Sequence, residues 1–286
     1  MIKSPLRYPG GKSRTINKIV ELLPDNFSEF REPFVGGGSL FIYLKQKHPH
    51  LKIWINDLNP ELFRFWKIAQ SELERMVDEI FYIKNSRLNG NNLFKELTDV
   101  AVEELSDFER AVRFFILNRI TFSGTVESGG FSKQAFERRF TQSSIERLGK
   151  LKHLLTDIKI TNLDYSYLLK DGNKNVFLFL DPPYLTATKS RLYGKRGELH
   201  SAFDHKRFSK LMKQCGENWL ITYDNCLEIR DNFCSFDIQG WEVQYGMNNY
   251  RQNVAVKGKE LFISNYKNKQ YCDTSDFKTI EQLRLL

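Results

Sequence analysis

The chain has 286 residues, a length that suits one large domain or a domain with a substantial insertion. Hydrophobic residues make up 41% of the chain, enough to fill a core, yet no apolar stretch approaches the length that spans a membrane. The formal net charge of +8 favours polyanionic partners, although many basic proteins bind none.

The cysteines and histidines do not indicate a metal site. None of the cysteines are two or three residues apart, so their spacing does not favour zinc. No signal peptide precedes them, and we therefore expect reduced thiols in a cytoplasmic protein. The pair His48 and His50 lacks cysteines or carboxylates at ligand spacing and is interpreted as a solvated turn. The four cysteines are Cys215, Cys226, Cys234 and Cys272.

The first 60 residues predict the first half of a nucleotide-binding βαβ unit. An ordered loop rich in glycine, proline and basic residues begins the chain, and an amphipathic helix that ends at Pro24 follows it. A strand then leads into a glycine loop, a helix and a second strand. The segments are the loop at 1–14, the helix at 14–23, the strand end at 32–35, the glycines at 36–38, the helix from 40 and the strand at 52–57.

Two glycine-rich segments near the N-terminus differ from phosphate-binding motifs. Residues 7–13 end like a Walker A loop, but Leu6 stands where that motif needs glycine. The loop at 36–38 fails as a dinucleotide fingerprint because Phe41 takes the position of the final glycine. Asp57 ends the next strand, where an acidic group can accept both ribose hydroxyls. A nucleoside ligand without pyrophosphate would explain both the glycine loop followed by Asp57 and the missing final glycine. Without Asp57, a tight turn would explain the glycines equally well.

Residues 60–145 predict a helical insertion. Apolar residues recur at helical spacing from Glu61 to about Lys84. A Gly- and Ser-rich loop at 122–131 interrupts the later helices and is followed by basic residues, among them Lys133 and Arg138. A purely structural helical lobe is the alternative. Capping boxes predict one helix from Ser106 and Glu109 to about Ile120, and another from Ser143 and Glu146 to about Leu155.

After residue 155 the alternation of strands and helices returns. Asp204 predicts the start of a helix that ends near Cys215. A long polar loop at 185–202 carries Lys189 and Arg191 and is typical of a lid or a binding loop. The last two strands predict a hairpin on the sheet edge. The remaining predicted elements are strands at 158–163, 176–180, 219–223, 241–245 and 260–264, and a short helix at 227–233.

The most informative segment is Asp181-Pro182-Pro183-Tyr184, directly after the apolar strand at 176–180. Two prolines cannot extend a hydrogen-bonded ladder, so the strand must end there. It thereby presents a carboxylate, exposed carbonyls and an aromatic ring at the carboxyl end of a strand, where α/β sheets bind ligands. These acceptors suit a flat group with an exocyclic amine, stacked on the ring. The alternative is a strand-ending turn with an incidental tyrosine.

One cofactor suits both the glycine loop with Asp57 and the segment from Asp181 to Tyr184. S-adenosylmethionine is a nucleoside that carries a methylsulfonium in place of phosphates. We expect its adenosine over the glycine loop and Asp57, and its methyl group directed toward Asp181 and Tyr184.

Taken together, these stretches resemble the Dam-type (class alpha, D12 class) DNA adenine-N6 methyltransferases over nearly the whole chain. The order of the motifs carries the resemblance, because each alone is only moderately specific. The matching stretches are residues 8–12 (cofactor motif), 32–39 (Gly-rich motif), 56–59 (ribose motif), 118–119 with 122–124 (start of the DNA-reading hairpin), 181–184 (catalytic tetrapeptide) and 260–266 (C-terminal strand).

The resemblance implies an α/β fold, a Rossmann-like mixed sheet with an inserted helical target-recognition domain. The catalytic domain would comprise residues 1–59 and 146–286, and the recognition domain residues 60–145. The implied catalytic residues are Asp181, Pro182, Pro183 and Tyr184. The implied cofactor contacts are Tyr8, Lys12, Phe34, Gly36, Gly38, Asp57, Asp164 and Asp181, although core packing is the alternative for the aromatic residues. The implied DNA contacts are Lys12, Asn118, Arg119, Ser123, Glu127, Lys133, Arg138, Lys189 and Arg191.

One departure from the family pattern concerns the recognition sequence. GATC-reading members carry an arginine four residues after the asparagine of their hairpin, whereas this chain has Ser123 and Glu127 at those positions. Arginine reads guanine with two donors, and glutamate is an acceptor that suits the amino group of cytosine. The resemblance therefore does not carry GATC recognition over to this chain.

The resemblance implies methyl transfer to N6 of a flipped adenine in duplex DNA, in a restriction-modification system or a prophage. Duplex DNA is the implied partner; a cognate restriction endonuclease would accompany it, and we expect a monomer. Two alternatives stay open: methylation of RNA adenine, and a DNA-binding module whose cofactor pocket serves only as a sensor.

Overall fold

The computed structural model describes residues 1–8, 10–126, 129–170, 175–185, 203–243 and 258–267. Its described part contains a seven-stranded sheet in the order β3-β2-β1-β4-β5-β7-β6. Strands β1 to β5 are parallel, while β7 runs antiparallel to both β5 and β6. This is the predicted mixed α/β sheet with a hairpin at one edge. The strands are β1 (Glu29–Glu32), β2 (Lys52–Asn56), β3 (Ile158–Thr161), β4 (Val176–Leu180), β5 (Asn218–Asp224), β6 (Asp237–Val243) and β7 (Gly258–Ser264).

The sheet has its topological switch point between β1 and β4. From β1 the chain moves outward to β2 and β3, then returns to place β4 on the other side of β1. In open α/β sheets, ligands bind at the carboxyl ends of the strands where the order reverses. The two loops at this point are the glycine loop after β1 and the Asp181–Tyr184 turn after β4. The topology therefore brings the two most informative motifs to one edge of the sheet.

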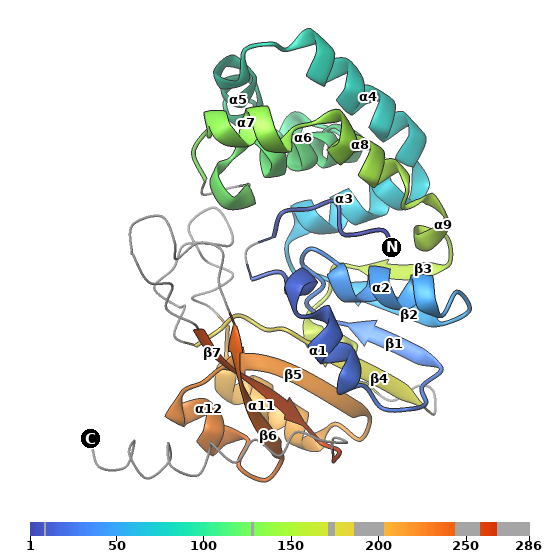
Figure 1. Cartoon of the computed structure of the whole chain (residues 1–286), viewed down its shortest axis with the longest axis vertical. Helices are drawn as coiled ribbons and strands as arrows, with labels where there is room; N and C mark the ends of the chain where they lie inside the picture. The colour runs from blue at the N-terminus through green and yellow to red at the C-terminus, as the bar shows by residue number, and fades with distance from the viewer. Residues whose placement is uncertain (9, 127–128, 171–174, 186–202, 244–257, 268–286) are drawn as a thin grey trace.

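Strand β4 shows why the sheet has a core on each face. All five of its residues are buried, and successive side chains of a strand point to opposite faces. Phe177 and Phe179 join the larger core, while Leu178 and Leu180 join a second core. Helices of the first half of the chain cover one face, and α11 and α12 cover the other (Figure 1). These helices are α1 (Ile16–Glu21), α2 (Ser39–Lys47), α11 (His205–Gln214) and α12 (Leu227–Asn232).

The helices from α3 to α8 gather into a lobe at one end of the molecule (Figure 1). Trp66 of α3 contributes to the same core as Phe41 of α2, so the lobe and the sheet share one continuous apolar interior. The division into residues 1–59 with 146–286 and residues 60–145 therefore stays a prediction. The remaining helices are α3 (Pro60–Ser71), α4 (Leu73–Ser86), α5 (Gly90–Thr98), α6 (Asp107–Ile120), α7 (Lys133–Arg139), α8 (Gln142–Gly149) and α9 (Lys152–Leu155).

The capping residues explain where the structure agrees with the predicted helices and where it differs. Ser106 and Glu109 form the predicted reciprocal capping box of α6. The box predicted from Ser143 and Glu146 is wrong, because Thr141 caps α8 and Ser144 completes its box. The single helical run predicted from residue 61 to residue 84 is divided at Glu72, whose backbone leaves helical geometry.

Within the described part of the chain, none of the helices has both the length and the apolar character needed to cross a membrane. The long loop predicted at 185–202 falls, except for Leu185, outside the described residues.

Candidate active site

The carboxylate of Asp181 lies at the end of β4 and has two partners. Its Oδ1 accepts a hydrogen bond of 2.6 Å from the hydroxyl of Thr222 on β5. The same oxygen lies 2.7 Å from Nζ of Lys12. The side chain of Asp181 keeps 22% of its surface exposed, so the carboxylate is held in place and still open to a ligand.

Lys12 connects the N-terminal segment to the catalytic turn. Its Nζ also donates to the hydroxyl of Tyr184 over 3.0 Å and to the carbonyl of Gly10 over 3.1 Å. Only 8% of the residue is exposed. An ammonium group shielded from water in this way interacts strongly with a nearby carboxylate. The structure thus brings together three of the residues predicted from sequence motifs far apart in the chain: Lys12, Asp181 and Tyr184.

The ring of Tyr184 stacks on the ring of a second tyrosine. Its ring lies 6.0 Å from that of Tyr223, with the two planes inclined by 30°. Tyr223 is fully buried, and its hydroxyl makes a short hydrogen bond with Nδ1 of His205. The next residue of β5, Asp224, accepts a 3.0 Å hydrogen bond from the backbone N–H of Leu185. The Asp181–Tyr184 turn is therefore held by β5 at both of its ends.

The glycine loop after β1 has no room for side chains. Gly36 has a φ of 47°, and a Cβ there would lie 2.8 Å from Cε1 of Tyr8. Gly38 has a φ of 68°, and a Cβ there would lie 2.3 Å from Cε1 of Phe41. Both positions require glycine, since left-handed backbone and close packing each exclude a side chain. Tyr8 packs against this loop.

Asp57 follows β2 and lies beside the glycine loop. Its Oδ2 accepts a 3.0 Å hydrogen bond from the N–H of Gly36, and its Oδ1 accepts one of 3.0 Å from the N–H of Asn59. Burial of the carboxylate raises its pKa to about 6 despite these bonds. The two oxygens of a carboxylate together offer about four acceptor positions, so the group can still accept a hydrogen bond from a ribose hydroxyl.

Glu32 is a site residue that sequence reasoning did not single out. It ends β1 with 4% of its surface exposed, and its Oε2 accepts a 3.3 Å hydrogen bond from the N–H of Phe41. Burial raises the pKa of Glu32 well above its ordinary value, and the carboxylates of Asp181 and Asp57 raise it further. Its place within the Gly-rich motif was the only available signal.

The chemistry of these groups fits S-adenosylmethionine. Glu32, Asp57 and Asp181 interact electrostatically around the glycine loop. Ionised carboxylates attract a sulfonium and an ammonium, and they would repel the phosphates of a dinucleotide. Asp57 and Asp181 are the groups that supply this charge, because the raised pKa of Glu32 favours its neutral acid. A loop without side chains allows a nucleoside to approach the backbone. The cofactor assignment is thus supported by the charge of the site and by the shape of its loop.

Asp164 and Phe34 lie on the neighbouring part of the sheet edge. The carboxylate of Asp164 pairs with Arg207 of α11 through bonds of 2.9 and 3.0 Å. Arg207 lowers the pKa of Asp164 to about 2. The ring of Phe34 lies 5.4 Å from that of Tyr165, the residue after Asp164. The structure brings these predicted cofactor residues together, and it adds Arg207, a partner that the sequence did not indicate.

The side chains of Asn118 and Arg119, two residues predicted to contact DNA, are buried and hydrogen-bond to backbone groups. Asn118 bonds both the N–H and the carbonyl of Arg7, over 2.8 and 2.7 Å, and donates to the carbonyl of Gly124 over 3.0 Å. Arg119 donates to the carbonyls of Pro5 and Arg139, each over 3.0 Å. These residues join the N-terminal segment to the helical lobe and are therefore assigned a positioning role.

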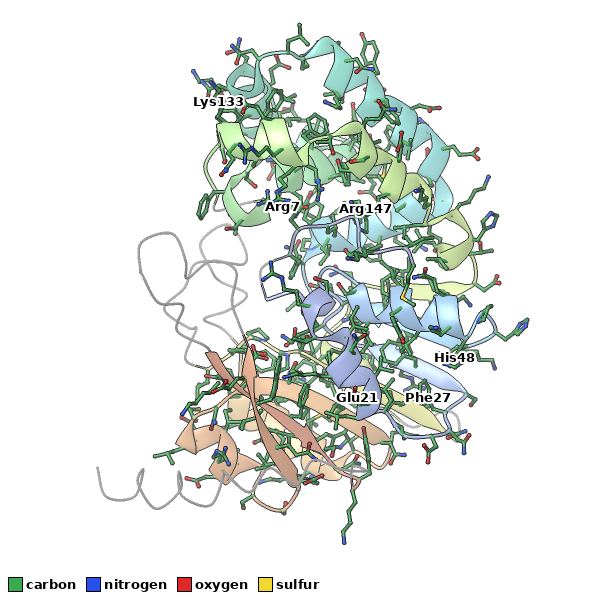
Figure 2. The ribbon with its side chains drawn as sticks, viewed as in Figure 1. Arg7, Glu21, Phe27, His48, Lys133 and Arg147 are labelled. Carbon is green, nitrogen blue, oxygen red and sulfur yellow. The ribbon has the colours of Figure 1, made fainter. Side chains whose placement is uncertain are left out.

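Positive charge gathers at this junction. Burial, together with repulsion from neighbouring guanidinium groups, lowers the pKa of Arg119 to about 9. Those neighbours are Arg7, Arg147 and Arg139. Arg7 and Arg147 lie where the N-terminal segment passes beneath the lobe (Figure 2). A concentration of guanidinium groups is a favourable environment for phosphate.

The loop after α6 presents residues to solvent. Phe122 is 60% exposed, and Ser123 has a φ of 55°, which few residues other than glycine, asparagine and aspartate adopt. Lys133 and Arg138 of α7 are exposed. Figure 2 shows Lys133 on the outer part of the lobe, well apart from Arg7. Glu127, Lys189 and Arg191 lie outside the described residues.

Comparisons with known proteins agree with this geometry. The family model of the D12 class N6 adenine-specific DNA methyltransferases matches residues 8–247. The chain is 25% identical to a type II methyltransferase, M1.LlaDCHI, of Lactococcus lactis over 82% of this chain and 77% of the relative. It is 25% identical to the type II methyltransferase M.MjaIII of Methanocaldococcus jannaschii, over 66% of this chain and 71% of the relative. It is 24% identical to the type II methyltransferase M.CviBI of a Paramecium bursaria Chlorella virus, over 93% of this chain and 100% of the relative.

Proposed function

The chain belongs to the D12 class N6 adenine-specific DNA methyltransferase family, and on that premise we propose that it methylates N6 of adenine at a specific sequence in duplex DNA. The observation that carries the proposal is the meeting of Lys12, Asp181 and Tyr184 at the switch point of the sheet. The glycine loop and Asp57 lie at the same edge of the sheet.

S-adenosylmethionine is the proposed cofactor. Asp57 would accept its ribose hydroxyls, while the backbone of Gly36 and Gly38 would lie beneath it and Tyr8 beside it. Phe34 and Asp164 would lie near the adenine of the cofactor. When bound, the cofactor supplies a methyl group that is already electrophilic, so the protein needs no covalent nucleophile.

The protein's chemical task is to activate a weak nucleophile. The lone pair of an adenine amine is delocalised into the ring. Hydrogen bonds from N6 to the carboxylate of Asp181 and the carbonyl of Pro182 would draw that lone pair out of conjugation. Catalysis would then come from positioning and from electrostatic stabilisation of the positive charge that develops on N6. The proton leaves N6 after the transfer, and Asp181 would be its acceptor.

Tyr184 would provide the platform for the base. An adenine extracted from the duplex loses its stacking partners, and an aromatic ring at the site replaces part of that lost energy. The support of Tyr184 by the buried ring of Tyr223 keeps this platform rigid. Lys12 donates to the hydroxyl of Tyr184 and pairs with Asp181, so it would hold the two groups at a fixed separation.

The names of the relatives favour a restriction-modification role, because three of them are type II methyltransferases. We therefore propose a cognate endonuclease as a functional partner and a monomer as the active form. Exposed basic residues of α7, Lys133 and Arg138, would contact DNA phosphates. The remaining DNA contacts predicted from the sequence, Lys12, Ser123, Glu127, Lys189 and Arg191, are part of the same proposal.

The test is transfer of a radioactive methyl group from S-adenosylmethionine to duplex DNA, followed by digestion and separation of the nucleosides. We expect the label in N6-methyladenine. The isosteric Asp181→Asn variant and the Asp181→Ala variant should both lose activity by about 100-fold or more, because each removes the charge that stabilises the developing cation.

Three outcomes would contradict the proposal. Full activity of Asp181→Ala would remove the carboxylate from the mechanism. Label in RNA of the same sequence, in place of DNA, would favour an RNA methyltransferase. Binding of S-adenosylmethionine without any transfer would favour a sensor.

A further inference from the structure

Three consecutive residues of β5 hold three points of the catalytic turn. Thr222 donates to Asp181, Tyr223 stacks beneath Tyr184, and Asp224 accepts from the N–H of Leu185. The pairing of Leu180 with Ile221 places the end of β5 directly beside the turn. No sequence motif indicated this segment, since the order of the strands brings it to the site.

The hydroxyl of Thr222 is the most specific of these contacts. The residue is fully buried, and the two residues that precede it in β5, Leu220 and Ile221, are buried and apolar. A buried hydroxyl is costly unless it is hydrogen-bonded, and valine has nearly the same shape without that cost. The 2.6 Å bond to Oδ1 of Asp181 is therefore the physical reason for a threonine at this position.

The same bond decides which oxygen of Asp181 meets the substrate. Thr222 and Lys12 both contact Oδ1. Among the described residues, none donates a hydrogen bond to Oδ2 of Asp181. With Oδ1 fixed from two sides, the carboxylate cannot rotate freely, and Oδ2 is the acceptor that stays available.

We propose that Thr222 is a positioning residue for methyl transfer, one that orients the carboxylate of Asp181 so that Oδ2 accepts from the N6 amine of adenine. This inference rests on the proposed function of the chain. Thr222 is fully buried, so it would reach cofactor and base only through Asp181. Removal of its hydroxyl should therefore slow the chemical step and leave binding intact.

The test is a comparison of Thr222→Val with the wild-type protein in single-turnover methyl transfer, with enzyme in excess over duplex DNA. Because the hydroxyl bonds a carboxylate, we expect a roughly 10- to 100-fold slower transfer. The KM values for DNA and for S-adenosylmethionine should stay within about twofold, as expected for an interaction that matters only in the transition state.

Two further variants separate positioning from stability. Thr222→Ser retains the donor and should recover most of the lost rate, whereas Thr222→Ala should not. Ser264→Ala removes another fully buried hydroxyl, one that donates to the carbonyl of Tyr266 over 2.8 Å on the neighbouring strand. This variant should keep the wild-type rate. The serine and alanine pair gives the answer even if the valine variant does not fold.

A folded Thr222→Val protein with a wild-type rate would overturn the inference, as would equal losses in Thr222→Ser and Thr222→Ala. A parallel rise in both KM values without a slower transfer would also overturn it. Failure of the proposed function is a different result, because the wild-type protein itself would then methylate no adenine.

Discussion

Asp57 is the residue whose protonation should govern cofactor binding. Its pKa is raised from 3.8 to about 6 by burial. The ionised carboxylate accepts hydrogen bonds from ribose hydroxyls on both oxygens, whereas the neutral acid carries a proton on one of them. We therefore expect the affinity for S-adenosylmethionine to rise as the pH increases through about 6. Titration calorimetry between about pH 5 and pH 7.5 measures this directly, and an affinity independent of pH would contradict the role of Asp57.

The contribution of Asp57 to the stability of the folded protein should fall as the pH rises, whereas the affinity for the cofactor should increase. A folded-state pKa above the unfolded value means that the folded protein binds more protons, so this contribution is fully present below pH 3.8 and is lost as the pH rises through about 6. The Asp57→Asn variant lacks this titration. It should bind the cofactor weakly and show a flatter pH profile of both affinity and melting temperature.

Lys12 offers a second test at the scale of single residues. Lys12→Met keeps most of the side-chain volume and removes the charge that pairs with Asp181 and the donor to Tyr184. We expect methyl transfer to slow by roughly 10-fold or more, because charge-assisted hydrogen bonds are the strong ones. The rate is measured with saturating cofactor and DNA.

Lys45→Met is the matched control for that change. Lys45 is also 8% exposed, but its Nζ donates to the carbonyl of Leu51, away from the site. Equal losses of activity in the two variants would show that Lys12 contributes only to stability.

The residues of the site fall into two groups, those that a short motif predicts and those that only the fold brings to the site. Asp57, Asp181 and Tyr184 belong to short motifs, whose chemistry is visible in the order of neighbouring residues. Thr222 and Arg207 contribute through contacts with residues that are distant in sequence, Asp181 and Asp164, which depend on strand order and helix packing. The DNA contact of Asn118 is predicted only from the family resemblance of its motif, which does not reveal that its side chain is buried.

At the scale of elements, the turn at Gly124 joins the helical lobe to the N-terminal segment. Its φ is 77°, and a Cβ there would lie 2.3 Å from the carbonyl oxygen of Arg7. Gly124→Ala should therefore lower the free energy of unfolding by roughly 2 kcal/mol or more, from backbone strain and overlap. It should also reduce DNA methylation, because Arg7 and the loop would shift. Urea denaturation and the transfer assay measure the two effects.

Gly130→Ala is the control in the same loop. Nothing lies within 4 Å of a Cβ at that position, so this variant should change stability by at most about 0.5 kcal/mol. A Gly124→Ala protein as stable and active as Gly130→Ala would show that the turn tolerates a side chain.

Local sequence patterns predict the individual strands and helices well, but they predict the order of the strands in the sheet less well. Strand β4 was predicted at its observed bounds, because five apolar residues followed by two prolines leave little freedom. Helix α6 was predicted from its capping box. The start of α8 was wrong because several hydroxyl residues compete there, and only the backbone shows that Thr141 provides the cap. The order of the strands depends on contacts across the whole chain.

At the scale of the whole molecule, the net charge of +8 should make DNA binding sensitive to salt. Each phosphate contact contributes about 0.9 to the slope of log K against log salt concentration. We expect the double variant Lys133→Gln with Arg138→Gln to reduce the magnitude of this slope by about 2, if both residues contact phosphates as proposed. Binding isotherms at several salt concentrations provide the slopes.

A control variant of equal charge distinguishes local contacts from overall attraction. Lys47 and Lys52 are exposed and lie within four residues of His48 in the sequence. Figure 2 shows His48 far from Lys133. Changing both to glutamine should leave the slope almost unchanged. Equal slopes for the two double variants would mean that α7 does not contact the DNA backbone.

The central claim is that this chain delivers a methyl group to the exocyclic nitrogen of adenine in DNA, with Asp181 as the essential acceptor. The most direct measurement is to express the wild-type and Asp181→Asn chains in bacteria that lack DNA methylation and to map modified bases across the genome. We expect N6-methyladenine at nearly every copy of one short sequence with the wild-type chain, and at few copies or none with the variant. A genome without N6-methyladenine in cells that make the folded wild-type protein, or methylated cytosine in its place, would contradict the claim.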